Sequence, residues 1–175
     1  MLTSPAATLE LGLWTRRCRN RLGYGRTSAV FAFGQERALK VTICPLAALW
    51  LRTSLRQKIQ GAPVVFKDLG VIGQALVHAD HKGRSISSPG PYEVHGFIVE
   101  RLFPLFATVE GYRQWAQSVT DWSAAVPDAA PAIRLALTLA EEHRTKADFA
   151  GKNNWLGRED GQQVLSDPLA TRLPV

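Results

Sequence analysis

Six consecutive residues in the last quarter of the chain combine side chains that suit phosphoryl transfer. Residues 148–153 read DFAGKN and fit the pattern D-x-x-x-x-N. Asp148 is suited to accept a proton from a hydroxyl nucleophile, and Asn153 offers magnesium an oxygen ligand without adding charge. We expect Lys152 to lie near the transferred phosphate. An ordinary polar loop gives the same pattern, because a motif with so few fixed positions is common by chance.

A second carboxylate follows at Asp167, where the apolar residues of the segment VLSDP end. Carboxylate oxygens are hard ligands that suit magnesium, so this position predicts a second metal ligand beside Asn153. An Asp-Pro pair is also typical of a simple turn, which is the structural alternative.

A glycine-rich segment near the other end of the chain is suited to contact phosphates. Residues 23–30 read GYGRTSAV and match G-x-G-x-x-x-x-V, with Ser28 where a third glycine would stand and Val30 at the end. Gly23 and Gly25 have no Cβ, so the backbone can approach a phosphate closely. The segment lies between two expected strands rather than before a helix, which argues against a dinucleotide-binding fingerprint or a Walker loop. A plain glycine turn remains the alternative.

Lys40 lies in the apolar segment 38–41, which reads ALKV and begins with Ala38. An ammonium group in a buried strand needs an anionic partner, because burying an uncompensated charge is costly. Phosphate oxygens are one such partner. The alternative is a lysine on an edge strand, where it faces solvent.

The elements that would position these residues follow from apolar periodicity and turn residues. Strands are expected at 12–22, 28–34, 38–43, 64–66, 70–77 and 96–102. A helix is expected from Pro45 to Gly61, because proline favours a first helical turn and glycine a helix end. Residues 34–37 form a tight turn, so the first three strands make an antiparallel meander.

Helices dominate the pattern after Pro104. We expect one helix at 108–124 and another at 128–144, with Asp128 as the N-cap of the second. Trp115 and Trp122 are seven residues apart and are expected in the core. A polar loop at 145–154 precedes a small hairpin, 155–158 and 162–166, whose turn contains Asp-Gly. This order predicts an α+β fold.

Composition narrows the class of protein. The formal net charge is +6, and basic residues cluster at 16–26 and 52–58. Such clusters favour an acidic partner, and nucleic acid is not excluded, although solvated surfaces give the same pattern. No apolar run is long enough for a membrane span, so no membrane partner is expected. The two cysteines predict neither a disulfide framework nor a metal site, and a cytoplasmic protein is the default expectation.

Four features of the chain occur in the order found in protein kinases. They are the glycine segment, the strand lysine, the D-x-x-x-x-N loop and the Asp-Pro segment. Over roughly residues 20–170 the chain is similar to the short early-gene serine/threonine kinases of tailed bacteriophages. This resemblance implies a minimal two-lobed fold, with an antiparallel-sheet N-lobe at 1–102 and a small helical C-lobe at 103–175. It also implies ATP and Mg²⁺ as cofactors, and transfer to Ser or Thr of host proteins in the host cytoplasm.

The resemblance assigns a role to each matching residue. Gly23 and Gly25 would cover the phosphates, and Lys40 would bind the α- and β-phosphates. Asp148 would be the catalytic base, while Asn153 and Asp167 would hold magnesium. The strand 97–100 stands where kinases have the hinge strand whose backbone bonds adenine. The remaining residues expected to contact the nucleotide are Ser28, Val30, Ala38 and Glu100.

The sequence also departs from the kinase pattern. Residues 41–67 contain no acidic residue to pair with Lys40, and Lys146-Ala147 stand where His-Arg is usual. Asn154 directly follows Asn153, so either could be the metal ligand. Only eight residues follow Asp167, and no activation segment is expected. Two alternatives therefore stay open: a pseudokinase that binds a host protein, and a small-molecule kinase.

Overall fold

The computed structural model describes residues 21–24, 27–75, 91–151 and 154–170. These residues pack as two compact units. The first contains the described parts of 1–48 and 65–101, and the second consists of 49–64 and 102–170. The two lobes expected from the sequence, 1–102 and 103–175, differ from these units chiefly in the segment 49–64.

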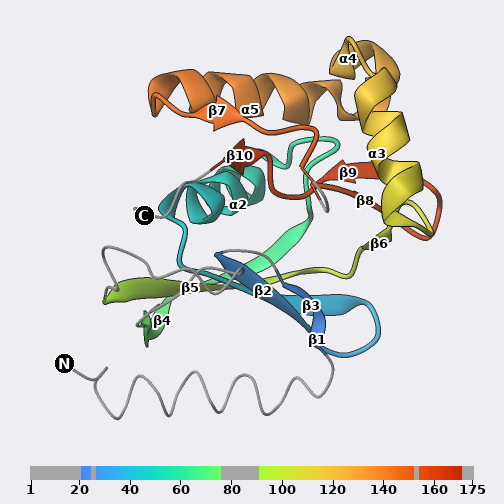
Figure 1. Cartoon of the computed structure of the whole chain (residues 1–175). Helices are drawn as coiled ribbons and strands as arrows, with labels where there is room; N and C mark the ends of the chain where they lie inside the picture. The colour runs from blue at the N-terminus through green and yellow to red at the C-terminus, as the bar shows by residue number, and fades with distance from the viewer. Residues whose placement is uncertain (1–20, 25–26, 76–90, 152–153, 171–175) are drawn as a thin grey trace. The chain divides into compact units, whose positions relative to one another are not determined.

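Within the described residues, the first unit is built on a five-stranded antiparallel sheet in the order β1-β2-β3-β5-β4 (Figure 1). The strands are β1 (Arg21–Tyr24), β2 (Ser28–Ala32), β3 (Arg37–Thr42), β4 (Val65–Ala75) and β5 (Tyr92–Glu100). The predicted meander of the first three strands is therefore confirmed where the structure describes it. The turn at 34–37 is closed by the Phe33 N–H, which donates to Arg37 O over 3.0 Å.

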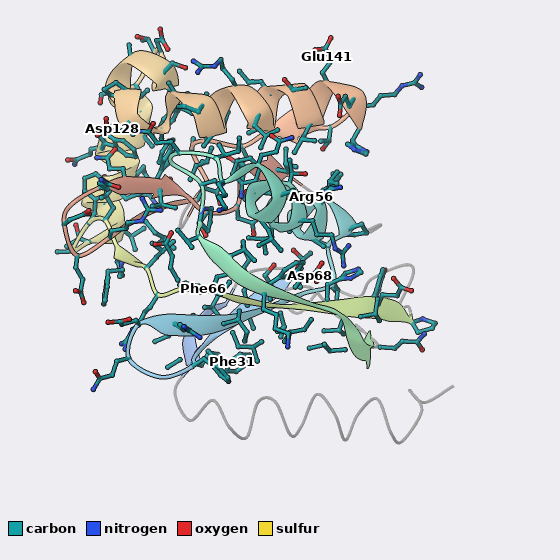
Figure 2. The ribbon with its side chains drawn as sticks, turned by 180° about the vertical axis from the view of Figure 1, so that it is seen from behind. Phe31, Arg56, Phe66, Asp68, Asp128 and Glu141 are labelled. Atoms are coloured by element: carbon teal, nitrogen blue, oxygen red, sulfur yellow. The ribbon has the colours of Figure 1, made fainter. Side chains whose placement is uncertain are left out.

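The two faces of this sheet are lined by different residues, because successive side chains of a strand point to opposite faces. One face forms an apolar core of Leu39, Val41, Ile72, Val94 and Ile98. Lys40 and Thr42 alternate with the core residues of β3 and belong to the opposite face. Phe31 and Asp68 accordingly lie on opposite sides of the sheet (Figure 2).

Strand β4 corrects two sequence predictions. The segments 64–66 and 70–77 were expected as separate strands, but residues 65–75 form one irregular strand paired with β5. The interruption occurs at Asp68, whose Oδ1 accepts the Gly70 N–H over 2.8 Å. Gly70 has φ +72°, which glycine adopts without strain and which lets the strand continue. Strand β5 also begins at Tyr92, earlier than the expected residue 96.

The second unit contains most of α2 (Pro45–Gln57), followed after the sheet by β6 (Phe103–Pro104), α3 (Val109–Ser118) and α4 (Trp122–Ala125). The prediction of one continuous helix at 108–124 is wrong. Val119 is extended, with φ −83° and ψ 115°, which ends α3. The Asp121 side chain then accepts the Ser123 and Ala124 N–H groups and starts a new helix.

The start of α5 (Ala130–Glu142) is also different from the prediction. Asp128 does not cap this helix, because it lies inside a 3₁₀ turn, η1 (Pro127–Ala129). Ala129 takes the cap position instead and makes no side-chain hydrogen bond there. Proline in the first turn favours the helix instead. Gly61 packs against this turn: a Cβ on Gly61 would lie 2.7 Å from Ala129 Cβ.

The C-terminal part of the second unit confirms the expected hairpin and adds a second strand pair. The hairpin is β8 (Trp155–Gly157) and β9 (Gln163–Leu165), with Gly161 at φ +85° in its turn. Strand β6 pairs with β8. The unpredicted pair is β7 (Lys146–Ala147) with β10 (Leu169–Ala170). Among the described helices, none has both the length and the apolar character needed to cross a bilayer.

Candidate functional site

The loop between β7 and β8, residues 148–154, is anchored at both ends by the segment that contains Asp167. At one end the Asp148 N–H donates to Pro168 O over 2.6 Å, which continues the β7–β10 pairing. At the other end the Ser166 N–H donates to Asn154 O over 2.7 Å. Asp167 lies between Ser166 and Pro168. The chain segments that carry Asp148 and Asp167 are therefore joined by backbone hydrogen bonds.

Side chains close the interior of the same loop. Asn154 Nδ2 donates to Asp148 O over 2.5 Å, and the Asn154 N–H donates to Gly151 O over 3.0 Å. The Trp155 indole N–H donates to Phe149 O over 2.9 Å. Since Asn154 uses its amide nitrogen to shape the loop, its role is at least partly structural. Asn153, the other metal-ligand candidate, and Lys152 lie outside the described residues.

Gly151 occupies a position where a side chain would not fit. A Cβ there would overlap Asp148 Oδ2 and Asn154 Nδ2 and would lie 2.9 Å from Asp148 Cγ. Real Cβ atoms avoid such contacts, so any larger residue here would displace the ends of the Asp148 and Asn154 side chains. The Asp148 carboxylate consequently lies directly against the loop backbone at Gly151.

Helix α3 supplies a further contact through Tyr112, which sequence analysis did not single out. Its hydroxyl donates to Gly151 O over 2.6 Å. Burial raises the pKa of Tyr112 to about 12, and the negative charge of Asp148 contributes to this rise. The phenol therefore remains a neutral donor at physiological pH. No sequence signal distinguished this tyrosine, because its hydrogen-bond partner, Gly151, is 39 residues away in the chain.

An aromatic cluster surrounds these contacts within the second unit. The Trp122 and Trp155 rings are stacked, with centroids 5.7 Å apart and planes at 13°. Trp115 packs edge-on against both, at 5.3 and 6.1 Å, and Phe149 lies 6.0 Å from Trp122. Trp115 and Trp122 thus belong to the packing of the unit, as predicted, although they come from two helices.

In the first unit, most of the residues expected to contact a nucleotide share one face of the sheet. The strand register pairs Val30 with both Gly23 and Lys40. Directly opposite residues of antiparallel strands project from the same face, as do residues two apart in one strand. Ser28, opposite Thr42, and Ala38, two residues before Lys40, therefore lie on this face as well. Gly25 lies outside the described residues.

The glycine segment is tied to the end of β3 by Thr42. The Ser28 hydroxyl donates to Thr42 Oγ1 over 2.8 Å, and the Thr42 hydroxyl donates to Thr27 O over 3.1 Å. The Ile43 N–H donates to the same Thr27 carbonyl over 2.9 Å. These contacts fix where the described part of the glycine segment meets β3.

Lys40 is only 5% exposed. Its strand register continues through Phe97 of β5 to Asp68 of β4, so an acidic residue lies on the same face two strands away. Sequence reasoning missed Asp68 because it directly follows the segment 41–67 that was searched for an acidic residue, and lies in β4. Glu100, the predicted hinge residue, is the last residue of β5 and pairs in register with Arg37.

The donor set of the anchored loop fits a hard divalent cation. Asp148 and Asp167 supply carboxylate oxygens, and magnesium in phosphotransfer sites typically takes one or two carboxylates together with substrate phosphates. Within the described ranges, no group of three or more His, Cys, Asp or Glu side chains could hold a metal ion. The contacts around Asp148 and those around Lys40 are each defined within their own unit. No family model matches the chain, and no curated protein matches it.

Proposed function

We propose that the chain is an ATP-dependent phosphotransferase of minimal, two-lobed, protein-kinase-like design, which transfers a γ-phosphoryl group to Ser or Thr hydroxyls of a protein. The observation that carries this proposal is the double anchoring of the 148–154 loop around Asp167. Phosphoryl transfer is catalysed mainly by positioning and electrostatic stabilisation, so a loop that carries Asp148 and is tied by its backbone to the segment of Asp167 suits the reaction.

Asp148 acts as the base. The hydroxyl oxygen of the acceptor bonds to the γ-phosphorus while its proton passes to a carboxylate oxygen of Asp148. The bond from the γ-phosphorus to the bridging oxygen breaks, and ADP leaves. Asp167 and Asn153 hold magnesium, which when bound neutralises charge on the β- and γ-phosphate oxygens.

In this proposal, residues of the first unit contact the nucleotide. Lys40 contacts the α- and β-phosphates, and Gly23 with Gly25 lets the backbone approach them. Support comes from the shared sheet face of Gly23, Val30 and Lys40 and from the burial of Lys40, whose ammonium is a strong donor to phosphate oxygens.

The test is transfer of label from γ-labelled ATP with magnesium, using a bacterial lysate as the source of acceptors. Asp148→Asn should lower transfer at least about a hundredfold, in line with the contribution of a general base, and should leave ATP binding unchanged. Asp128→Asn is the matched control, because Asp128 is an exposed aspartate of the same unit outside the loop. Transfer that survives in Asp148→Asn would refute the proposal.

A pseudokinase is the second candidate. One observation favours it: residues 41–67 offer Lys40 no acidic partner on the helix that follows β3. ATP binding that requires Lys40, with no transfer from the wild-type protein to any acceptor, would select this candidate. If the wild-type protein also failed to bind ATP, both the phosphotransferase and the pseudokinase would be excluded.

A further inference from the structure

We propose that Tyr112 is a positioning residue for this transfer, its hydroxyl holding the Gly151 carbonyl and with it the loop that carries Asp148. The inference rests on the proposed function and assigns the control of loop geometry to a helix 39 residues away in sequence. Tyr112 acts through the backbone of the loop and takes no part in the chemical step.

The contact is well placed for this role. Tyr112 is 8% exposed, and its 2.6 Å hydrogen bond reaches the middle of the loop, between the anchors at Asp148 and Asn154. Gly151 has no side chain that a neighbouring residue could contact, and glycine has the greatest backbone freedom of any residue. A hydrogen bond to its carbonyl therefore restrains the part of the loop that is otherwise least constrained.

The hydroxyl has a role separate from that of the ring. The ring packs edge-on against Phe106 and Trp115, with centroids 5.7 and 5.8 Å away. A phenylalanine would preserve both contacts, so packing alone does not require a tyrosine. Within the described residues, the hydroxyl bonds only to Gly151, and losing it would leave that carbonyl with the Asn154 N–H.

The sequence before Asp148 explains why the loop needs outside support. Lys146 is exposed and Ala147 has only a methyl group, so the strand leading into the loop offers no long polar side chain directed at its interior. The contacts that organise the interior come instead from Tyr112 on one side and from Asn154 and Trp155 on the other. Since the Asp148 carboxylate lies against Gly151, movement of this backbone would displace it.

The test is Tyr112→Phe, which removes one oxygen. Because the lost contact positions a catalytic group, kcat should fall about tenfold while KM for ATP stays unchanged. Tyr92→Phe is the matched control, since Tyr92 lies on β5 in the first unit, and it should retain the wild-type kcat. Near-ultraviolet circular dichroism should match for all three proteins if the aromatic packing is preserved.

Hydrogen exchange supplies a readout that does not depend on activity. In Tyr112→Phe the Asn154 amide should exchange about tenfold faster than in the wild type, because the Gly151 carbonyl that accepts it is no longer held. Unchanged exchange, or an unchanged kcat beside an active wild type, would overturn the positioning role alone. A wild type without transfer would overturn the proposed function, and the positioning role with it, whatever the exchange rates.

Discussion

The 148–154 loop and the sheet face around Lys40 are kept in place by opposite means. The loop depends on individual atoms: the Tyr112 hydroxyl, the Asn154 amide and the Trp155 indole each donate to one of its carbonyls. The Lys40 face depends on regular strand pairing over a buried core. Positions on the face are therefore fixed by many equivalent contacts, whereas the loop is fixed by a few specific ones.

This difference predicts different sensitivities. A single-atom change in the loop should lower transfer while most of the unit stays folded. Replacement of Lys40 should weaken nucleotide binding, while the strand pairing of β2 and β3, which does not depend on the Lys40 side chain, should keep the backbone in place. The following substitutions test this contrast.

The largest effect is expected for Gly151→Ala. The added methyl would overlap Asp148 Oδ2 and Asn154 Nδ2, so the Asp148 carboxylate and the Asn154 amide must move from their positions. We expect transfer to fall about a hundredfold, and the free energy of unfolding to fall by about 1–3 kcal/mol. Gly157→Ala is the control, since the nearest atom to its Cβ would be Leu105 Cδ1 at an ordinary 3.5 Å. Equal effects of the two substitutions would contradict the account.

A smaller, separate effect is expected for Lys40→Met, which keeps the length of the side chain and removes its charge. A charge-assisted hydrogen bond contributes about 1.5–3 kcal/mol, so ATP affinity should fall roughly ten- to a hundredfold. Calorimetry measures the affinity. Amide exchange in the loop should match the wild type, and a change there would show that the two regions are not independently organised.

The sequence predicted those elements whose signals are local. The β8–β9 hairpin follows from Asp160-Gly161: Gly161 takes positive φ, and Asp160 Oδ1 accepts the Gln162 N–H over 2.9 Å. The strand with Lys40 follows from its apolar pattern. Asp148 and Asp167 were selected as a pair by residue type and order, and in the structure the chain segments that carry them are joined by backbone hydrogen bonds.

Features that depend on distant partners were not predictable. Strands β7 and β10 are two residues long, and their pairing leaves no periodicity in the sequence. The break between α3 and α4 lacks glycine and proline, so the apolar spacing appeared continuous. Asp128 was chosen as an N-cap by residue type, but a 3₁₀ turn takes its place and moves the helix start to Ala130.

A moderate effect is expected for Trp155→Phe, which removes the indole N–H that bonds to Phe149 O. Trp155 is only 1% exposed. The substitution therefore removes one hydrogen bond, which contributes about 1 kcal/mol, and also leaves a cavity, which is smaller than the cavity that a full truncation of the side chain would leave. Chemical denaturation should show a lower free energy of unfolding, and kcat should fall about fivefold. An unchanged kcat would mean that the Phe149 carbonyl does not need this donor.

The last effect is confined to high pH and is a pH dependence of stability. Burial and the Asp148 charge raise the pKa of Tyr112 from 10.0 to about 12. Between these values the unfolded chain loses the phenol proton while the folded chain keeps it, so stability falls as pH rises from 10 to 12. Below pH 10 the Tyr112 phenol adds no pH dependence to the free energy of unfolding. Chemical denaturation from pH 10 to 12 should show that the free energy of unfolding falls less steeply in Tyr112→Phe than in the wild type. Parallel plots of this free energy against pH would contradict the assignment of the fall to Tyr112.

The central claim is that the two carboxylates have different tasks, and magnesium-dependent ATP affinity tests it most directly. Calorimetry with and without Mg²⁺ would compare the wild type with Asp167→Asn and Asp148→Asn. We predict that Mg²⁺ strengthens ATP binding in the wild type and in Asp148→Asn, and that this gain is lost in Asp167→Asn. A gain that persists in Asp167→Asn, or that is absent from the wild type, would contradict the account.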